Sequence, residues 1–97
     1  MTVAERFGAN LKRCRKRARL SQVEVADRAG LHRTEIGFLE QGKRKPRIDT
    51  LVKLSAAVEA DVGELLAGID WVPRNSTGGS FYVAPWAVPL RSDLPTS

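Results

Sequence analysis

The fold is decided by residues 20–42, which read LSQVEVADRAGLHRTEIGFLEQG. Residues 21–24 form a capping box, in which a serine and a glutamate satisfy the first backbone N–H groups of a helix. Gly30 is a natural helix stop, and His32 begins a second helix that ends at Gly42. The stretch therefore predicts two short helices joined by a tight glycine turn.

Helical periodicity continues on both sides of this stretch. A second capping box at residues 2–5 opens a helix to about residue 18, and further helices are predicted from residue 48 or 49 and from residue 62. The apolar positions expected to face the core are Phe7, Leu11, Cys14, Ala18, Val25, Ala26, Ala29, Ile36, Leu39, Leu51, Leu54, Val58, Leu65 and Leu66. Cys14 is expected to be a small core residue rather than a redox group. The pattern predicts a mainly α fold, with a compact five-helix domain over residues 1–68.

The composition changes after residue 68. Two β-prone runs at 69–73 and 80–84 flank a turn-rich cluster at 75–79, which predicts a hairpin. Residues 85–97 hold three of the five prolines and are expected to be extended. We therefore expect 69–97 to form a separate C-terminal hairpin and tail.

The charge is divided unevenly along the chain. Residues 1–47 carry 13 Lys/Arg against 5 Asp/Glu, a net +8, whereas residues 48–97 carry 3 against 6, a net −3. Such a basic half indicates a polyanionic partner. The sequence has no apolar run long enough to span a membrane, no signal-peptide pattern and one cysteine, so we expect a cytoplasmic, nucleoid-associated protein without membrane contact.

The two central helices and their turn form a helix-turn-helix pattern, and the surrounding residues make it specific. About residues 6–67 resemble the DNA-binding domain of the lambdoid phage repressor and Cro family, the XRE type. The elements that carry the resemblance are Leu20-Ser21-Gln22, Ala26, Ala29-Gly30-Leu31, Ile36, Leu39-Glu40-Gln41-Gly42, Pro46 and Thr50-Leu51. The resemblance implies that the second helix of the motif enters the major groove of double-stranded DNA.

The resemblance also implies a set of phosphate ligands around that helix. They are Gln22, His32, Gln41, Lys43 and Arg44. Gln22 begins the first helix of the motif, where backbone N–H groups add a partial positive charge. In the family this glutamine can also orient a base-reading side chain. These contacts would fix register and dominate salt-dependent affinity without reading sequence.

Four residues remain on the outward side of the second helix as candidates for base reading. Arg33 can bond two acceptors of a guanine, or alternatively a phosphate. Thr34 offers a hydroxyl and a methyl group, so it can hydrogen-bond to a base or contact a thymine. Gly37 either admits close backbone approach to DNA or is a tolerated substitution. Phe38 either contacts a thymine methyl or folds against Lys45 or an apolar neighbour.

Two further expectations concern carboxylates. Arg15 and Glu40 match a family pair that joins the first helix to the second helix of the motif, with a guanidinium fork meeting a carboxylate. Glu35 is expected to cap the start of its helix rather than to read a base, because its charge would repel phosphates.

The aromatic residues of the hairpin are Trp71, Phe81, Tyr82 and Trp86. The expected use of this surface is dimerisation, since most small members of the family read a palindromic operator as dimers. The alternatives are that the hairpin folds back on its own chain or captures another protein by strand addition.

We therefore expect a sequence-specific transcriptional regulator, a repressor, that binds a palindromic operator as a homodimer. The alternative is an antitoxin or adaptor that binds DNA and holds a partner protein through its hairpin. The sequence shows no catalytic constellation and no metal-ligand spacing, so we expect no enzyme, no cofactor and no metal.

Overall fold

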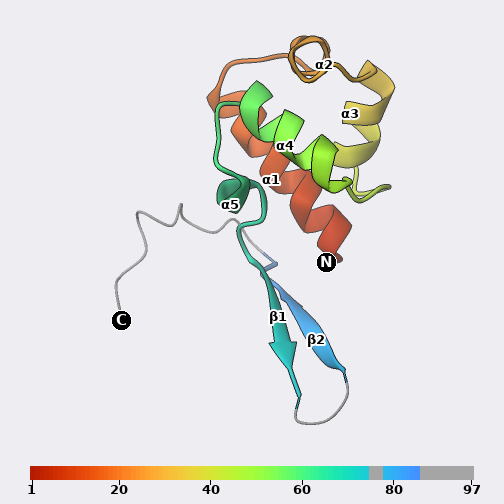
Figure 1. Ribbon diagram of the computed structural model, residues 1–97, viewed down its shortest axis with the longest axis vertical. Coiled ribbons are helices and arrows are strands. Elements are labelled where there is room, and N and C mark those ends of the chain that lie inside the picture. Colours follow the sequence, from red (N-terminus) through yellow and green to blue (C-terminus); the bar gives the residue numbers. More distant parts are fainter. Residues whose placement is uncertain (75–77, 86–97) are drawn as a thin grey trace.

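The computed structural model describes residues 1–74 and 78–85, and it confirms the mainly α fold with a C-terminal hairpin. The elements follow the order α1 (Val3–Arg17), α2 (Gln22–Ala29), α3 (Arg33–Glu40), α4 (Ile48–Ala57), α5 (Val62–Leu65), β1 (Ile69–Pro73) and β2 (Gly79–Val83). The helices gather into one body, and the hairpin extends away from it (Figure 1). The helix starts and turns therefore agree with the sequence pattern.

Local side chains fix the helix ends, as the capping boxes predict. The hydroxyls of Thr2 and Ser21 each accept a hydrogen bond at 3.1 Å from the backbone N–H of the glutamate three residues on. Those glutamates, Glu5 and Glu24, accept from the cap N–H at 2.8 and 2.9 Å. Gly30 ends α2 with φ 65°, a left-handed conformation that side chains disfavour, and it turns the chain into α3.

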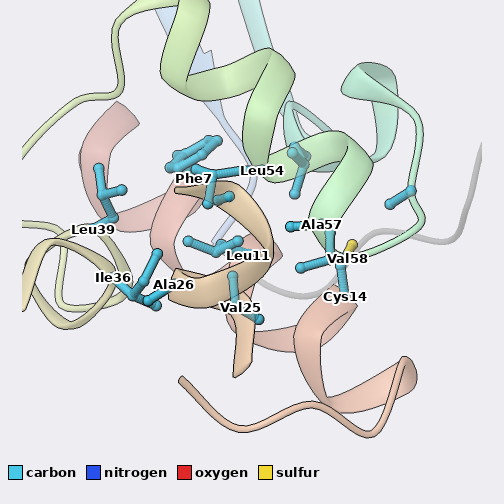
Figure 2. Close-up of a cluster of buried hydrophobic side chains, with 13 residues drawn as sticks. Phe7, Leu11, Cys14, Val25, Ala26, Ile36, Leu39, Leu54, Ala57 and Val58 are labelled. Carbon is cyan, nitrogen blue, oxygen red and sulfur yellow. The ribbon is translucent and has the colours of Figure 1, made fainter. Parts of the chain in front are cut away.

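An apolar cluster joins the helices. Its buried members are Phe7, Leu11, Cys14, Val25, Ala26, Ala29, Ile36, Leu39, Leu54, Ala57, Val58, Ala60 and Leu65. The expectation for Leu66 was wrong, because this residue follows the last turn of α5 and is 39% exposed. Side chains from α1, α2, α3 and α4 converge on one centre in Figure 2. Burial raises the pKa of the Cys14 thiol, which therefore stays protonated inside the core, as expected for a structural cysteine.

Two glycines allow α1 and α3 to approach closely. A Cβ at Gly8 would lie 2.6 Å from the carbonyl oxygen of Glu40, and a Cβ at Gly42 would lie 2.8 Å from the Cα of Glu5. Gly42 also has φ 74°, which suits the end of a helix. Neither position admits a larger side chain without movement of the backbone, so these glycines set how α3 sits on α1.

Two buried polar side chains of α1 hold the base of the hairpin. Arg6 donates from Nε to the carbonyl of Ala67 at 3.1 Å and from a terminal nitrogen to the carbonyl of Ala84 at 3.3 Å. The Asn10 amide donates to the carbonyls of Leu65 and Ala67 at 2.9 and 2.8 Å. Burial lowers the pKa of Arg6, but a guanidinium remains charged in a protein. The hairpin is thus attached to its own helices at its base.

The strand register divides the hairpin into two unlike faces. Antiparallel pairing places Trp71 opposite Phe81 and Asp70 opposite Tyr82, and successive residues alternate between faces. One face carries Ile69, Trp71, Pro73, Gly79, Phe81 and Val83, whereas the other carries Asp70, Val72, Ser80 and Tyr82. We call the first set the apolar hairpin face. Its Trp71 and Phe81 are 51% and 59% exposed.

Candidate nucleic-acid interface

The outward side of α3 borders an open hollow on the surface. Ile36 and Leu39 are completely buried and therefore fix which side of α3 faces outward. The hollow is lined by Gln22, His32, Arg33, Thr34, Gly37, Phe38 and Gln41. The structure thus brings together all the predicted base readers and the predicted phosphate ligands other than Lys43 and Arg44.

His32 caps α3, as the sequence predicts. Its Nδ1 accepts a hydrogen bond from the backbone N–H of Thr34 at 3.1 Å. A neutral imidazole that accepts at Nδ1 carries its proton on Nε2. The cap therefore leaves the exposed His32 ring with one N–H donor, the group that a phosphate oxygen requires.

The predicted ion pair is present behind the hollow. Arg15 Nε lies 2.6 Å from Glu40 Oε2, and its terminal nitrogen lies 3.0 Å from Glu40 Oε1. The side chains are only 12% and 4% exposed, and the hydrogen bond to Glu40 raises the pKa of Arg15. Glu40 Oε1 also accepts from Gln22 Nε2 at 3.1 Å. One carboxylate therefore joins α1, the start of α2 and the end of α3.

Gln22 is oriented by this carboxylate. Its amide nitrogen carries two hydrogens, and the bond to Glu40 uses one of them. The second remains for another acceptor, and the side chain lines the hollow. A phosphate contact from Gln22 is compatible with this geometry.

The expectation for Glu35 was wrong. The side chain that caps the start of α3 is the His32 imidazole, and the Glu35 carboxylate lies on the other side, 3.5 Å from Arg44. The His32 imidazole accepts from the N–H of Thr34, and the Glu35 carboxylate accepts from Arg44. Arg44 therefore has a carboxylate partner within its own chain.

The Phe38 ring, which is half-buried, lies beneath two cations. The Lys43 ammonium lies 5.7 Å from the ring centroid, and the Arg44 guanidinium carbon lies 4.9 Å from it. These distances fall within the range of a cation–π attraction. The structure thus places Lys43 and Arg44 over the ring, whereas the sequence suggested Lys45 or an apolar neighbour. The ring still lines the hollow.

Gly37 is not required by packing. A Cβ built on Gly37 would meet nothing within 4 Å, because the position opens into the hollow. Arg33 and Thr34 on the preceding turn are exposed. The absent side chain leaves the backbone of α3 accessible between them and Phe38.

The aromatic residues of the hairpin do not form one surface. Trp71 and Phe81 meet edge to face at 5.0 Å between ring centroids on the apolar hairpin face. Tyr82 is 53% exposed but lies on the opposite face. Trp86 lies outside the described residues. The surface predicted for dimerisation therefore divides between the two faces.

The sequence pattern did not predict the burial of Arg6 and Asn10. Each precedes a core residue, Phe7 or Leu11, and they are four residues apart, so they share one edge of the apolar stripe on α1. That spacing was the only sign in the sequence that they could be buried. Arginine usually faces solvent, and the burial of Arg6 depends on carbonyls far along the chain.

Two absences hold for the described ranges, residues 1–74 and 78–85. Within them no cluster of His, Cys, Asp and Glu could hold a metal ion. No helix in the same ranges has the length and apolar character to cross a membrane.

The fold and the hollow along α3 together define a helix-turn-helix DNA-binding domain. The pattern of the helix-turn-helix family matches residues 11–65, more than half of the chain, and the chain belongs to this family, in its XRE branch. Relatives that share this domain include a transcriptional regulator and a control protein. The match ends before β1 and does not include the hairpin.

Named relatives and a solved structure agree with this assignment. An HTH-type transcriptional regulator of Bacillus subtilis is 37% identical over 62 residues, which cover 64% of this chain and 53% of the regulator, so the chain spans about half of that protein. Control protein C.SmaI of Serratia marcescens is 36% identical over 66 residues, 68% of this chain and 79% of that protein. The restriction-modification controller protein C.AhdI of Aeromonas hydrophila has 32% identity and a TM-score of 0.62, covering 64% of this chain and 94% of that chain.

Proposed function

We propose that this protein is a repressor that binds a palindromic operator as a homodimer, with α3 in the major groove. The observation that carries the proposal is the hollow along the outward side of α3, which gathers hydrogen-bonding side chains beside an accessible stretch of backbone. The major groove admits a helix and presents a distinct pattern of donors and acceptors for each base pair.

Base reading falls to the residues on the outward turns of α3. Arg33 extends from the first turn and offers a fork of donors to guanine N7 and O6. Thr34 offers a hydroxyl and a methyl group at the same level. Gly37 permits close approach of the helix, and the edge of the Phe38 ring is available to a thymine methyl.

Phosphate binding falls to the residues around the rim. Gln22 has a free amide hydrogen, and His32 keeps its Nε2 proton. Gln41, Lys43 and Arg44 are exposed at the other end of α3. Cations and helix N-termini at these positions would hold the DNA backbone and fix the register of α3 without reading the sequence.

Dimerisation is assigned to the apolar hairpin face. A lone two-stranded hairpin is marginally stable in water, and burial of Trp71 and Phe81 would stabilise it. The described part of the hairpin carries one acid, Asp70, and one base, Arg74, whereas residues 1–47 carry a net +8. Two copies repel each other least when they meet at the neutral hairpin. The similarity to control proteins supports a regulatory role.

The test is selection of bound fragments from a random DNA pool, followed by a salt titration on the enriched duplex. We expect an inverted repeat with half-sites about one helical turn apart, or a multiple of it. The logarithm of the binding constant should fall linearly with the logarithm of salt concentration, by about 0.9 for each phosphate contact. Failure to enrich any sequence, or binding that ignores salt, contradicts the proposal. Enrichment of a single, unrepeated half-site would refute the homodimer.

A further inference from the structure

The C-terminal end of α3 sets the place of Lys43 beside Phe38. The backbone N–H of Lys43 donates to the carbonyl of Phe38 at 3.0 Å, and that of Gly42 donates to the carbonyl of Leu39 at 3.2 Å. With Gly42 at φ 74°, these two bonds form a Schellman motif. In this motif the side chains of the residues that correspond to Phe38 and Lys43 come into contact. The backbone therefore directs the lysine stem over the ring.

Arg44 reaches the same ring from the next position in the loop. Its guanidinium carbon is 4.9 Å from the centroid of Phe38, and one of its terminal nitrogens is 3.5 Å from the Glu35 carboxylate. Phe38 and Glu35 both belong to α3, whose inward side is locked into the core by Ile36 and Leu39. Two cations on an exposed loop are thus held against a rigid helix.

We propose that Phe38 is a positioning residue: its aromatic face holds Lys43 and Arg44 where α3 brings the loop to the DNA phosphates. This inference rests on the proposed function, in which α3 enters the groove and the loop meets the backbone. Long cationic side chains lose rotamer freedom when they bind. A ring that restricts them beforehand lowers that cost, and the attraction of its quadrupole for cations leaves their N–H groups available.

A thymine-reading role for Phe38 has different consequences. If the ring acted only on a thymine methyl, its loss would weaken the operator complex and spare binding to random DNA. If the ring positions the cations, both kinds of DNA lose affinity together, because phosphate contacts do not depend on sequence. The salt dependence then changes as well, since fewer phosphates are neutralised.

The main experiment compares Phe38→Leu and Phe38→Trp in the full chain. The probes are a random-sequence duplex and the duplex enriched by the wild-type protein, each titrated over a range of salt. We expect Phe38→Leu to weaken both complexes by a similar factor, up to about 30-fold for two exposed cation–π contacts. The salt slope should decrease by about 1–2, and Phe38→Trp should restore it.

A second replacement separates the electrostatic effect of the ring from the effect of its packing. Pentafluorophenylalanine at position 38 keeps the shape of the ring but reverses its quadrupole, so it repels the cations that phenylalanine attracts. We expect the same joint loss as for Phe38→Leu, with an unchanged melting temperature. Unchanged affinity for random DNA with either replacement overturns the inference, whether or not the enriched duplex is affected.

A double-mutant cycle identifies the residues through which the ring acts. In an Arg44→Gln, Lys43→Gln background, Phe38→Leu should cause little further loss on random DNA, because the cations are already absent. A full additional loss in that background would show that the ring does not act through them. If the wild-type protein itself shows no salt-dependent binding to random DNA, the proposed function fails. That outcome differs from wild-type binding with a Phe38 variant of unchanged affinity, which overturns only the role of the ring.

Discussion

Arg15 and Glu40 form a two-point ion pair that joins α1 to α3, with the Nε–Oε2 distance at 2.6 Å. The same carboxylate accepts from Gln22 at the start of α2. The pair lies behind the surface proposed to meet DNA, so it orients that surface without belonging to it. A single acidic side chain thus couples the packing of three helices to the proposed interface.

Arg15→Met is expected to lower the free energy of unfolding by about 3 kcal/mol, because it leaves the nearly buried Glu40 carboxylate without a counter-ion. Arg17→Met on the same helix is the matched control. Arg17 pairs with Glu64 at 3.0 Å, but its side chain is 41% exposed, so its loss should cost less than about 1 kcal/mol. Urea denaturation of both variants measures the difference. An equal loss of unfolding free energy in the two variants would show that burial of the Arg15–Glu40 pair contributes nothing.

Arg33→Ala is expected to reduce affinity for the enriched duplex by about 1–3 kcal/mol and to leave random-sequence binding nearly unchanged. The reason is that Arg33 extends from the first turn of α3 and lines the hollow. Lys43→Ala provides the contrast, since a phosphate ligand should weaken both complexes alike. Fluorescence anisotropy on the two duplexes measures both effects. Parallel losses for Arg33→Ala would identify it as a phosphate ligand.

Phe81→Ser is expected to convert a dimer to a monomer in light scattering, because it removes an aromatic side chain from the apolar hairpin face. Tyr82→Ser is the control: Tyr82 is similarly exposed, at 53% against 59%, but lies on the opposite face. A dimer that survives Phe81→Ser, or that is lost in Tyr82→Ser alone, contradicts the assignment of this face. Co-purification of a different chain that Phe81→Ser abolishes would favour the adaptor reading.

Deletion of the whole C-terminal segment is a poorer test of the same idea. Removal of residues 69–97 would also remove Ile69, which packs on the core, and the carbonyl of Ala84, which accepts from Arg6. A change of mass in such a truncation would therefore mix lost association with lost folding. Point substitutions on the exposed part of the strands avoid this.

Acid is expected to destabilise the protein through its capping glutamates. The backbone hydrogen bond at Thr2 lowers the pKa of Glu5, that at Ser21 lowers the pKa of Glu24, and the Arg17 side chain lowers the pKa of Glu64. A carboxylate with a folded pKa below its unfolded pKa contributes stability above the unfolded value, about 4.3. That contribution is lost as pH falls through the folded value. Urea denaturation from about pH 6 to about pH 3 should show the decline, and Glu24→Gln should reduce its slope.

Much of the helical domain followed from local signals. Thr2, Ser21 and Gly30 act on backbone groups within a few residues, so their effects could be predicted from the sequence alone. The Arg15–Glu40 pair spans 25 residues and was expected only through the family resemblance. The four base-reading candidates in the hollow followed from Ile36 and Leu39, which fix the outward side of α3, whereas Gln22, His32 and Gln41 were expected through the family resemblance.

The failures have physical causes as well. Burial of Arg6 depends on carbonyls 61 and 78 residues away, which no local pattern encodes. Glu35 was assigned to the helix start because its charge would repel phosphates, but the His32 imidazole caps the helix and the Glu35 carboxylate lies 3.5 Å from Arg44. The contact between Phe38 and Lys43 could have been predicted, because Gly42 is typical of the Schellman motif that brings these two side chains together.

Gly37→Ala is expected to have opposite effects on stability and on DNA binding. The added Cβ meets nothing within 4 Å, so alanine should raise the free energy of unfolding by up to about 1 kcal/mol through helix propensity. The same Cβ projects into the hollow, where it would keep the helix backbone from the base edges, and affinity for the enriched duplex should fall. Thermal unfolding and anisotropy measure the two effects.

Gly63→Ala is the matched control, because Gly63 is also helical and its Cβ would also meet nothing within 4 Å. It lies on α5, outside the hollow, so it should stabilise without changing DNA affinity. If Gly37→Ala stabilises and binds the enriched duplex as tightly as wild type, glycine at this position is a tolerated substitution. Loss of affinity in Gly37→Ala alone would instead tie the glycine to close approach of α3, because both substitutions add a Cβ to a helix and only Gly37 lines the hollow.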